Sequence, residues 1–329
     1  MTRRNLIKGA GVAGVTLIVP ESVFPGTVPI DVKNSGFVKF KTGKIELLAV
    51  TDGHTKFAPV QPIFAPGAKP DEINKILSDN FLPGDGIDVA YNTLVLRKGE
   101  EVVLFDTGCG HHFGPTSGKL ADNLQAAGIE PASVTAVLLT HAHPDHIGGL
   151  TDKDGKLIYP NATVYISKAE YDFWTGSQPD FSKCKADKGF TDLMISIAKP
   201  NLQAAKDNLR FFNDGDLLFD CVKVQVVPGH TPGHTLSHIS IEDEELIHMG
   251  DISHDATLLL THPEWGVAFD TDFDAAAKAR RLILSDLAEG RKNIFSFHLP
   301  WPGLGYIRKK GDGFEWVARP FSTPQIDVA

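Results

Sequence analysis

Four side chains of the kind that bind transition metals stand within six residues of one another. They are His141, His143, Asp145 and His146. Imidazole nitrogens and carboxylate oxygens together suit zinc and its first-row neighbours. Packing these groups without a cation would bury several polar atoms without partners, at roughly 1–3 kcal/mol each. The segment therefore predicts a metal site in which His141 and His143 reach one ion while Asp145 and His146 reach a second.

One loop cannot complete the coordination of two ions, so further donors must come from distant parts of the chain. Three candidates each follow an apolar run: His230, Asp251 and His298. A side chain on a loop at a strand end can turn toward a shared site while the strand fixes its position. We therefore expect these three side chains to converge on the loop at 141–146.

The elements that must position these donors are short. Apolar runs of four to six residues, bounded by Gly, Pro, Asp or charged residues, predict strands buried on both faces. These runs lie at 45–50, 93–96, 102–105, 136–139, 163–166, 222–227 and 294–297. Strands that alternate with helical patterns indicate an α/β layered domain.

Two segments between the runs have helical spacing. The first, 119–127, places Leu120, Leu124 and Ala127 on one face, and Gly128 stops it. The second, 274–289, has the residues Ala277, Arg281, Leu284 and Ala288 at helical spacing before Gly290. Residues 176–200 are expected to form a loop followed by a helix over a cleft.

Composition limits the partners. The 329-residue chain has a formal net charge of −9, with 42% hydrophobic and 22% charged residues, which is ordinary for a globular protein. Because its surface would repel polyanions, no nucleic-acid partner is expected. Three isolated cysteines, Cys109, Cys184 and Cys221, indicate neither a disulfide framework nor a thiolate zinc site.

The N-terminus has the pattern of an export signal. Arg3 and Arg4 precede an 11-residue apolar run at 9–19, which is typical of twin-arginine export. The run is shorter than the roughly 20 residues that a membrane span needs. We therefore predict an export signal and linker at 1–35, a single hydrolase domain at 36–329, periplasmic or secreted localisation, and no membrane anchoring after export.

The four donor segments together resemble the successive metal motifs of the metallo-β-lactamase superfamily. The resemblance implies an αββα four-layer sandwich. It also implies one ion on His141, His143 and His230, a second on Asp145, His146 and His298, and Asp251 as the bridge between them. Asp106, in Phe105-Asp106-Thr107-Gly108, matches the family's early aspartate, which supports a ligand histidine from outside the coordination sphere.

Flanking motifs resemble one branch, methyl parathion hydrolase and its lactone-cleaving relatives. They include Phe113-Gly114-Pro115-Thr116, Asp172-Phe173-Trp174, Gly189-Phe190 and the segment 298–305. The resemblance places Phe113, Trp174 and Phe190 around the substrate groove, and it implies a homodimer. Such aromatic walls favour a small, neutral, apolar substrate.

One position departs from that branch. His254, three residues after Asp251, stands where organophosphate-cleaving members usually have a hydrophobic residue. We expect this imidazole to hydrogen-bond a substrate carbonyl or ring oxygen, with Phe269 narrowing the same side. His234 and His238 could support ligands from outside the coordination sphere, but a turn or strand role is favoured for both. The remaining histidines, His54, His111, His112, His248 and His262, are treated as structural.

These features predict a dinuclear hydrolase, with zinc as the expected metal. Two ions about 3.5–4 Å apart can hold a hydroxide that attacks an electrophilic centre. The predicted catalytic carboxylates are Asp251, the bridge, and Asp145, to which the resemblance assigns the transfer of a proton to the leaving group. Lactones or aryl esters, including acyl-homoserine lactones, are the expected substrates.

Other activities compete with this prediction. Phosphotriester hydrolysis is the first alternative, and β-lactam hydrolysis is weaker because no residue is assigned to a β-lactam carboxylate. A redox di-iron protein is disfavoured by the intact His143, which such proteins replace with a carboxylate. A metal-holding protein without turnover is disfavoured by the complete ligand set.

Overall fold

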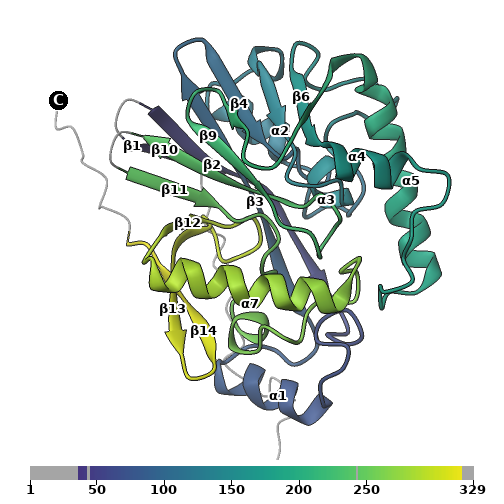
Figure 1. Cartoon of the computed structure of the whole chain (residues 1–329), viewed down its shortest axis with the longest axis vertical. Coiled ribbons are helices and arrows are strands. Elements are labelled where there is room, and N and C mark those ends of the chain that lie inside the picture. Colours follow the sequence, from purple (N-terminus) through teal and green to yellow (C-terminus); the bar gives the residue numbers. More distant parts are fainter. Residues whose placement is uncertain (1–35, 43–44, 242–243, 321–329) are drawn as a thin grey trace, which may run out of the picture. The chain divides into compact units, whose positions relative to one another are not determined.

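Two seven-stranded sheets form the centre of the domain (Figure 1). The computed structural model describes residues 36–42, 45–241 and 244–320, and these described residues belong to one compact unit. The first sheet has the order β1-β2-β3-β4-β5-β6-β7, and the second has the order β14-β13-β12-β11-β10-β9-β8.

The strands of the first sheet are β1 (Phe37–Thr42), β2 (Ile45–Phe57), β3 (Ile87–Lys98), β4 (Glu101–Phe105), β5 (Ala136–Leu138), β6 (Thr163–Ser167) and β7 (Leu209–Phe212). Those of the second are β8 (Leu217–Leu218), β9 (Val222–Val226), β10 (Thr235–Ile241), β11 (Glu244–His248), β12 (Asn293–Phe295), β13 (Leu304–Lys310) and β14 (Gly313–Ala318). The helices are α1 (Pro70–Asp79), α2 (Leu120–Ala126), α3 (Pro144–Ile147), α4 (Lys168–Thr175), α5 (Lys188–Ala204), α6 (Leu258–Thr261) and α7 (Phe273–Glu289).

Apolar side chains from both faces of each sheet create four layers. Side chains such as Leu47, Phe105 and Val224 fill the space between the two sheets. Helices α2, α4 and α5 cover the outer face of the first sheet, and α7 covers that of the second. The predicted αββα sandwich is confirmed, and central strands such as β4 and β5 are apolar on both faces because they are covered on both.

All seven predicted strands overlap observed ones, and the predicted helix at 119–127 corresponds to α2 with its expected buried face. The prediction was less complete around β2 and β3, whose 13 and 12 residues extend well past the apolar runs. Helix α1, which lies between them, was not predicted. Its apolar side chains Ile73, Ile76 and Leu77 do lie on one face, so a helical signal was present in the sequence and was overlooked.

The predicted face of α7 was wrong by one residue. Its buried side chains are Phe273, Ala276, Arg280, Leu284 and Leu287, whereas Arg281 is exposed. The side chain of Arg280 is buried because it donates to the carbonyls of Ile252 and Pro263 and forms an ion pair with Asp270. Hydropathy values alone cannot distinguish Arg280, whose polar atoms all have partners, from Arg281, which is exposed to solvent.

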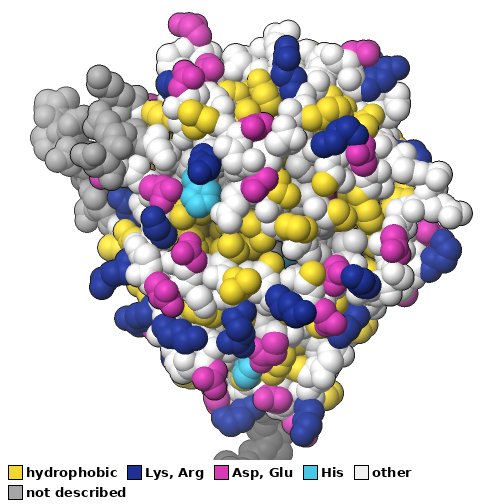
Figure 2. Space-filling model, viewed as in Figure 1, with side chains coloured by type: hydrophobic (Ala, Val, Ile, Leu, Met, Phe, Trp, Pro, Cys, Tyr) yellow, Lys and Arg dark blue, Asp and Glu magenta, His cyan; other side chains and the backbone are white. Residues whose placement is uncertain are grey.

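Figure 2 shows acidic and basic side chains interspersed over the face that carries α7. All three cysteines are free, as predicted. Among the described residues no helix is long and apolar enough to cross a membrane. The twin-arginine segment within 1–35 lies outside the described residues, so the export signal and its localisation stay predictions, as does the homodimer.

Candidate metal centre and active site

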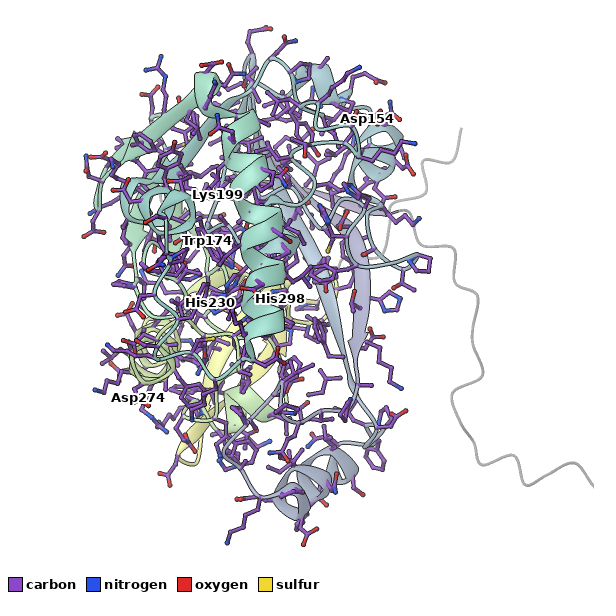
Figure 3. All side chains as sticks on the ribbon, turned by 90° about the vertical axis from the view of Figure 1, so that its right-hand side faces the viewer. Asp154, Trp174, Lys199, His230, Asp274 and His298 are labelled. Atoms are coloured by element: carbon purple, nitrogen blue, oxygen red, sulfur yellow. The ribbon has the colours of Figure 1, made fainter. Side chains whose placement is uncertain are left out.

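The predicted donors lie just after the carboxyl ends of strands in both sheets. Strand β5 pairs in parallel with β4, and β11 pairs in parallel with β12. The loop at 141–146 follows β5, Asp251 follows β11 and His298 follows β12. Figure 3 shows His230 and His298 close together in the interior. Parallel strands end at the same edge of a sheet, which explains why Asp251 and His298 meet. The packing of the two sheets against each other brings these two side chains to the loop after β5, which belongs to the first sheet.

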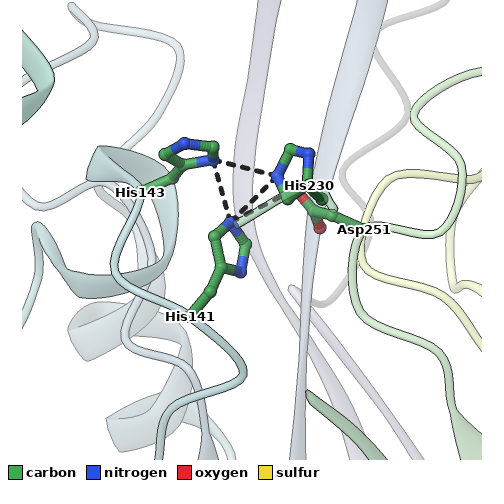
Figure 4. Close-up of side chains that lie close together, drawn as sticks. All are labelled: His141, His143, His230 and Asp251. Atoms are coloured by element: carbon green, nitrogen blue, oxygen red, sulfur yellow. Dashed lines mark hydrogen bonds and ion pairs between the residues drawn. The ribbon is translucent and has the colours of Figure 1, made fainter. Parts of the chain in front are cut away.

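Three histidines form the first cluster (Figure 4). Nδ1 of His143 lies 3.0 Å from Nε2 of His141 and 2.9 Å from Nε2 of His230. The Nε2 atoms of His141 and His230 are 3.2 Å apart. All three rings are buried, and their three ring nitrogens face one point.

The second cluster contains Asp145, His146 and His298. Oδ2 of Asp145 lies 3.4 Å from Nε2 of His298 and 3.6 Å from Nε2 of His146. Asp251 touches both clusters: Oδ1 is 3.2 Å from His146 Nε2, while Oδ2 is 3.2 Å from His230 Nε2 and 3.1 Å from His298 Nε2. The structure thus brings together all seven predicted donors, with Asp251 between the two groups.

The arrangement fits divalent cations. Ligands 2.0–2.1 Å from a tetrahedral zinc are separated by about 3.3–3.4 Å, close to the separations between these ring nitrogens. Nε2 of His146 and Oδ1 of Asp251 are buried and have no hydrogen-bond partner. Buried polar atoms without partners are costly, and a cation at each cluster would satisfy them.

The electrostatics of the histidines suit this role. Burial and the neighbouring imidazoles lower the pKa of His141 and His143 well below the usual value, so both rings are neutral and can donate lone pairs. Burial alone would also lower the pKa of His230, but its contacts with Asp251 and Asp270 raise it to about 9. That ring keeps a proton in the absence of a competing cation, and metal binding would displace the proton from Nε2.

Two carboxylates orient ligand histidines from outside the clusters. Oδ2 of Asp106 lies 2.9 Å from Nδ1 of His146, and the same carboxylate accepts the backbone N–H of Thr140. Asp106 itself has φ +61°, a left-handed conformation that Asp tolerates better than most residues. The structure therefore places Asp106 where the resemblance implied, behind a ligand histidine.

The second of these carboxylates, Asp270, was missed by the sequence analysis. Its Oδ1 lies 2.7 Å from Nδ1 of His230, and its Oδ2 accepts from Arg280 at 3.0 Å. Burial would raise the pKa of Asp270, but Arg280 and His230 lower it to about 2. No motif surrounds Asp270, so the sequence alone carries no signal for this contact.

Glu170 joins two of the ligand loops and was also missed. Its buried carboxylate accepts from the backbone N–H of Ala142 and Gly233, from the hydroxyl of Thr231 and from Nε1 of Trp174. The sequence does contain a signal for a helix start there, because Ser167 caps α4 by accepting from the Glu170 N–H. That signal predicts where the helix begins, but it does not indicate that the Glu170 side chain points toward the ligand loops.

His234 supports Asp251. Its Nε2 accepts the Asp251 N–H at 2.9 Å, and burial lowers the pKa of His234 to about 3, which keeps the ring neutral. A Cβ on Gly250, which has φ +50°, would lie 2.5 Å from that nitrogen, so glycine is needed there. The sequence analysis favoured a turn or strand role for His234, although the repeat of Pro-Gly-His-Thr at 228–231 and 232–235 could have drawn attention to this second histidine.

His254 lies beside the ligand groups in the interior of the protein and not at the exposed entrance of the active site. The ring is buried and stacks on His298 with centroids 4.8 Å apart. Its Nε2 lies 3.0 Å from Oδ2 of Asp251, and together with Asp251 and His298 it forms a third potential ligand group. Its position is compatible with the predicted substrate contact and with metal binding.

Two cavities flank the centre. The aromatic cavity is lined by Phe113, Phe190 and Phe269 together with His143 and Asp145, and it has a volume of about 30 Å³. The α1 cavity has a volume of about 440 Å³, and its lining includes Leu77, Leu82, Ile87, Ala256, His254 and His298. The predicted substrate-binding residues Phe113, Phe190 and Phe269 line the first cavity, and His254 lines the second. The apolar wall of the second cavity was missed because α1 was not predicted.

The prediction for Trp174 needs correction. Its ring is fully buried, lines neither cavity and packs edge-on behind His143 at a centroid distance of 5.5 Å. Its Nε1 is directed to Glu170. A buried indole needs a partner for its N–H, and satisfying it turns Trp174 away from the groove.

Comparisons with known proteins agree with this geometry. The chain is similar to the dizinc quorum-quenching lactonase AidC, solved in complex with the product N-hexanoyl-L-homoserine. The two share 39% identity and a TM-score of 0.84, over 88% of this chain and 99% of that one. It is also similar to hydrolase AbOPH of the β-lactamase superfamily, at 28% identity and a TM-score of 0.80, over 88% of this chain and 100% of that one.

Among curated proteins, the N-acyl homoserine lactonase AttM of Agrobacterium fabrum is 31% identical over 34% of this chain and 38% of its own. Metallo-beta-lactamase domain-containing protein 1 of Xenopus laevis is 32% identical over 36% of this chain and 45% of its own. The alignments thus span less than half the length of these two relatives. A model of the Metallo-beta-lactamase superfamily matches residues 86–295, and since that is more than half of the 329 residues, the chain belongs to this family, as its motifs predicted.

Proposed function

We propose that this protein is a metal-dependent lactonase with two zinc ions, and that acyl-homoserine lactones are its substrates. The observation that carries the proposal is the convergence of seven His and Asp donors in two groups that share Asp251. The similarity to AidC over nearly the whole domain supports the choice of lactones. Divalent ions held there would polarise the ester carbonyl and ionise a water molecule near neutral pH.

The residues of the chain divide the remaining work. Asp251 contacts both ligand groups through its two oxygens and so fixes their positions relative to each other. Asp145 has the more accessible carboxylate, 17% exposed against 1% for Asp251, and it also lines the aromatic cavity. That position lets Asp145 transfer a proton to the alkoxide that leaves when the lactone ring opens.

His254 favours an oxygen-rich substrate. Its Nδ1 is buried and has no hydrogen-bond partner in the protein, and its ring lines the α1 cavity beside His298. Burial lowers the pKa of His254 to about 3, so the ring is neutral at working pH, and its single N–H is available to a substrate in the tautomer that carries the proton on Nδ1. A carbonyl or ring oxygen of a lactone would accept that hydrogen bond, whereas a purely apolar group would leave it unmade.

A substrate panel tests the proposal. Protein purified without chelator and loaded with zinc is assayed against N-hexanoyl-homoserine lactone, dihydrocoumarin, methyl parathion and nitrocefin. We expect kcat/KM to be highest for the acyl-homoserine lactone and at least 100-fold lower for methyl parathion. Faster turnover of the phosphotriester or of nitrocefin would contradict the proposal, and activity that survives complete metal removal would contradict the metal-dependent mechanism.

A further inference from the structure

The two cavities beside the centre differ in what they can hold. The aromatic cavity has a volume of about 30 Å³, far below the volume of about 440 Å³ of the α1 cavity. The α1 cavity therefore has much more room for a flexible chain. A substrate whose reacting carbonyl lies at the centre has most room to extend into the α1 cavity.

The walls of the α1 cavity are apolar on the side away from the centre. Leu77 and Leu82 come from α1 and the turn after it, Ile87 begins β3, and Ala256 faces them from the loop after Asp251. His254 and His298 also line the cavity, and these two side chains belong to the ligand groups. The cavity therefore joins the metal centre directly to an apolar surface.

The charged side chains at the rim are already paired. Lys56 lies 2.7 Å from Asp85, and Asp88 lies 2.6 Å from His54. Asp255 accepts backbone N–H groups of the segment that leads into α6. None of these groups is free to hold a charged tail, so the lining selects a neutral, flexible chain.

Resting on the proposed lactonase function, we infer that the acyl chain of the substrate lies in the α1 cavity and that the aromatic cavity does not receive it. This assigns acyl-length selectivity to Leu77, Leu82, Ile87 and Ala256, in place of the aromatic residues that the branch resemblance indicated. Burial of one methylene group is worth about 0.8 kcal/mol. This corresponds to about a fourfold rise in kcat/KM if the whole burial free energy stabilises the transition state. We therefore expect kcat/KM to rise at least 10-fold from the butanoyl to the octanoyl homoserine lactone.

Two adjacent residues provide a matched test. Leu82 is 41% exposed and lines the cavity, whereas its neighbour Phe81 is 97% exposed and does not. A carboxylate at position 82 would be desolvated by a bound chain, so Leu82→Asp should lower the octanoyl-to-butanoyl ratio of kcat/KM at least fivefold. Phe81→Asp should leave the ratio within twofold of wild type. Both sites are exposed enough for the variants to fold.

Two further variants separate the cavities. Ala256→Phe fills the α1 cavity and should lower the same ratio at least 10-fold, whereas Leu193→Asp in the aromatic cavity should change it less than twofold. The inference is overturned if Leu193→Asp lowers the ratio while Leu82→Asp and Ala256→Phe do not. A ratio that stays flat from butanoyl to octanoyl in the wild type overturns it as well.

A binding measurement keeps this inference separate from the proposed function. Calorimetry on the zinc-loaded protein with N-octanoyl-homoserine and N-butanoyl-homoserine, the ring-opened products, requires no turnover. We expect tighter binding of the octanoyl product and loss of that preference in Leu82→Asp and not in Phe81→Asp. If no lactone is hydrolysed, the proposed function fails. If the two products bind equally to the wild type, the cavity assignment fails.

Discussion

Oδ1 of Asp270 lies 2.7 Å from Nδ1 of His230, on the side of the ring opposite the metal cluster. The other oxygen of Asp270 accepts from Arg280, whose Nε also donates to the carbonyl of Ile252, next to Asp251. One buried ion pair thus fixes the ring of one ligand and the backbone beside another. The positions of the ligands therefore depend on Asp270 and Arg280, which do not bind the metal, as well as on the ligand residues themselves.

Weakening this contact should weaken metal binding. Asp270→Asn keeps the shape and one oxygen acceptor but removes the charge that fixes the His230 tautomer. We expect zinc affinity, measured by competition with a chromophoric chelator, to fall about 10–100-fold. The control is Asp274→Asn, an exposed position on α7, which should leave the affinity unchanged. Equal affinities in the two variants would show that Asp270 does not act through His230.

The two ligand groups should be separable by mutation. His298 belongs to the second group and to the group containing His254, but not to the three-histidine cluster. We expect His298→Ala to reduce bound zinc from two ions per chain to one, as measured by elemental mass spectrometry after gel filtration. His262, stacked on Trp265 outside the clusters, supplies the control, and His262→Ala should retain two ions. Two tightly held ions in His298→Ala would contradict the assignment of this ligand.

Glu170 should be essential for the stability of the ligand loops. The Glu170→Ala variant would leave four buried donors without their acceptor, including the N–H groups of Ala142 and Gly233. We expect the free energy of unfolding to fall by about 3–5 kcal/mol, measured by urea denaturation of the metal-free protein so that metal binding does not contribute. Glu72→Ala, at an exposed position of α1, should cost less than about 0.5 kcal/mol. A loss below 1 kcal/mol in Glu170→Ala would contradict this role.

The sequence predicted the parts of this protein whose signal is local. Donor spacing in the loop at 141–146 and apolar runs before His230, Asp251 and His298 were sufficient to name the residues that converge, because a ligand must follow the strand that positions it. The supporting layer was not predictable in the same way. Asp270 and Glu170 act across the tertiary structure, and an isolated carboxylate looks the same in the sequence whether it is solvated or buried. The α1 cavity was missed because its walls come from segments that carry no motif.

His254 provides the sharpest remaining test, because its position allows two roles with opposite consequences for metal content. Its Nε2 is 3.0 Å from Oδ2 of Asp251, and its Nδ1 has no protein partner. If His254 contacts substrate, His254→Leu should retain two zinc ions per chain while kcat/KM for N-hexanoyl-homoserine lactone falls about 10–100-fold. The hydrolysis of methyl parathion, which offers no lactone oxygen to this N–H, should fall less, so the ratio of the two rates should move toward the phosphotriester.

We expect this outcome because the second group already supplies donors from Asp145, His146 and Asp251 in addition to His298. The control is His254→Gln, whose amide can still donate a hydrogen bond at this position and should recover part of the lactone rate. Elemental analysis and the two assays are performed on the same preparation. Loss of one zinc ion in both variants, with the two activities falling together, would instead identify His254 as a metal ligand.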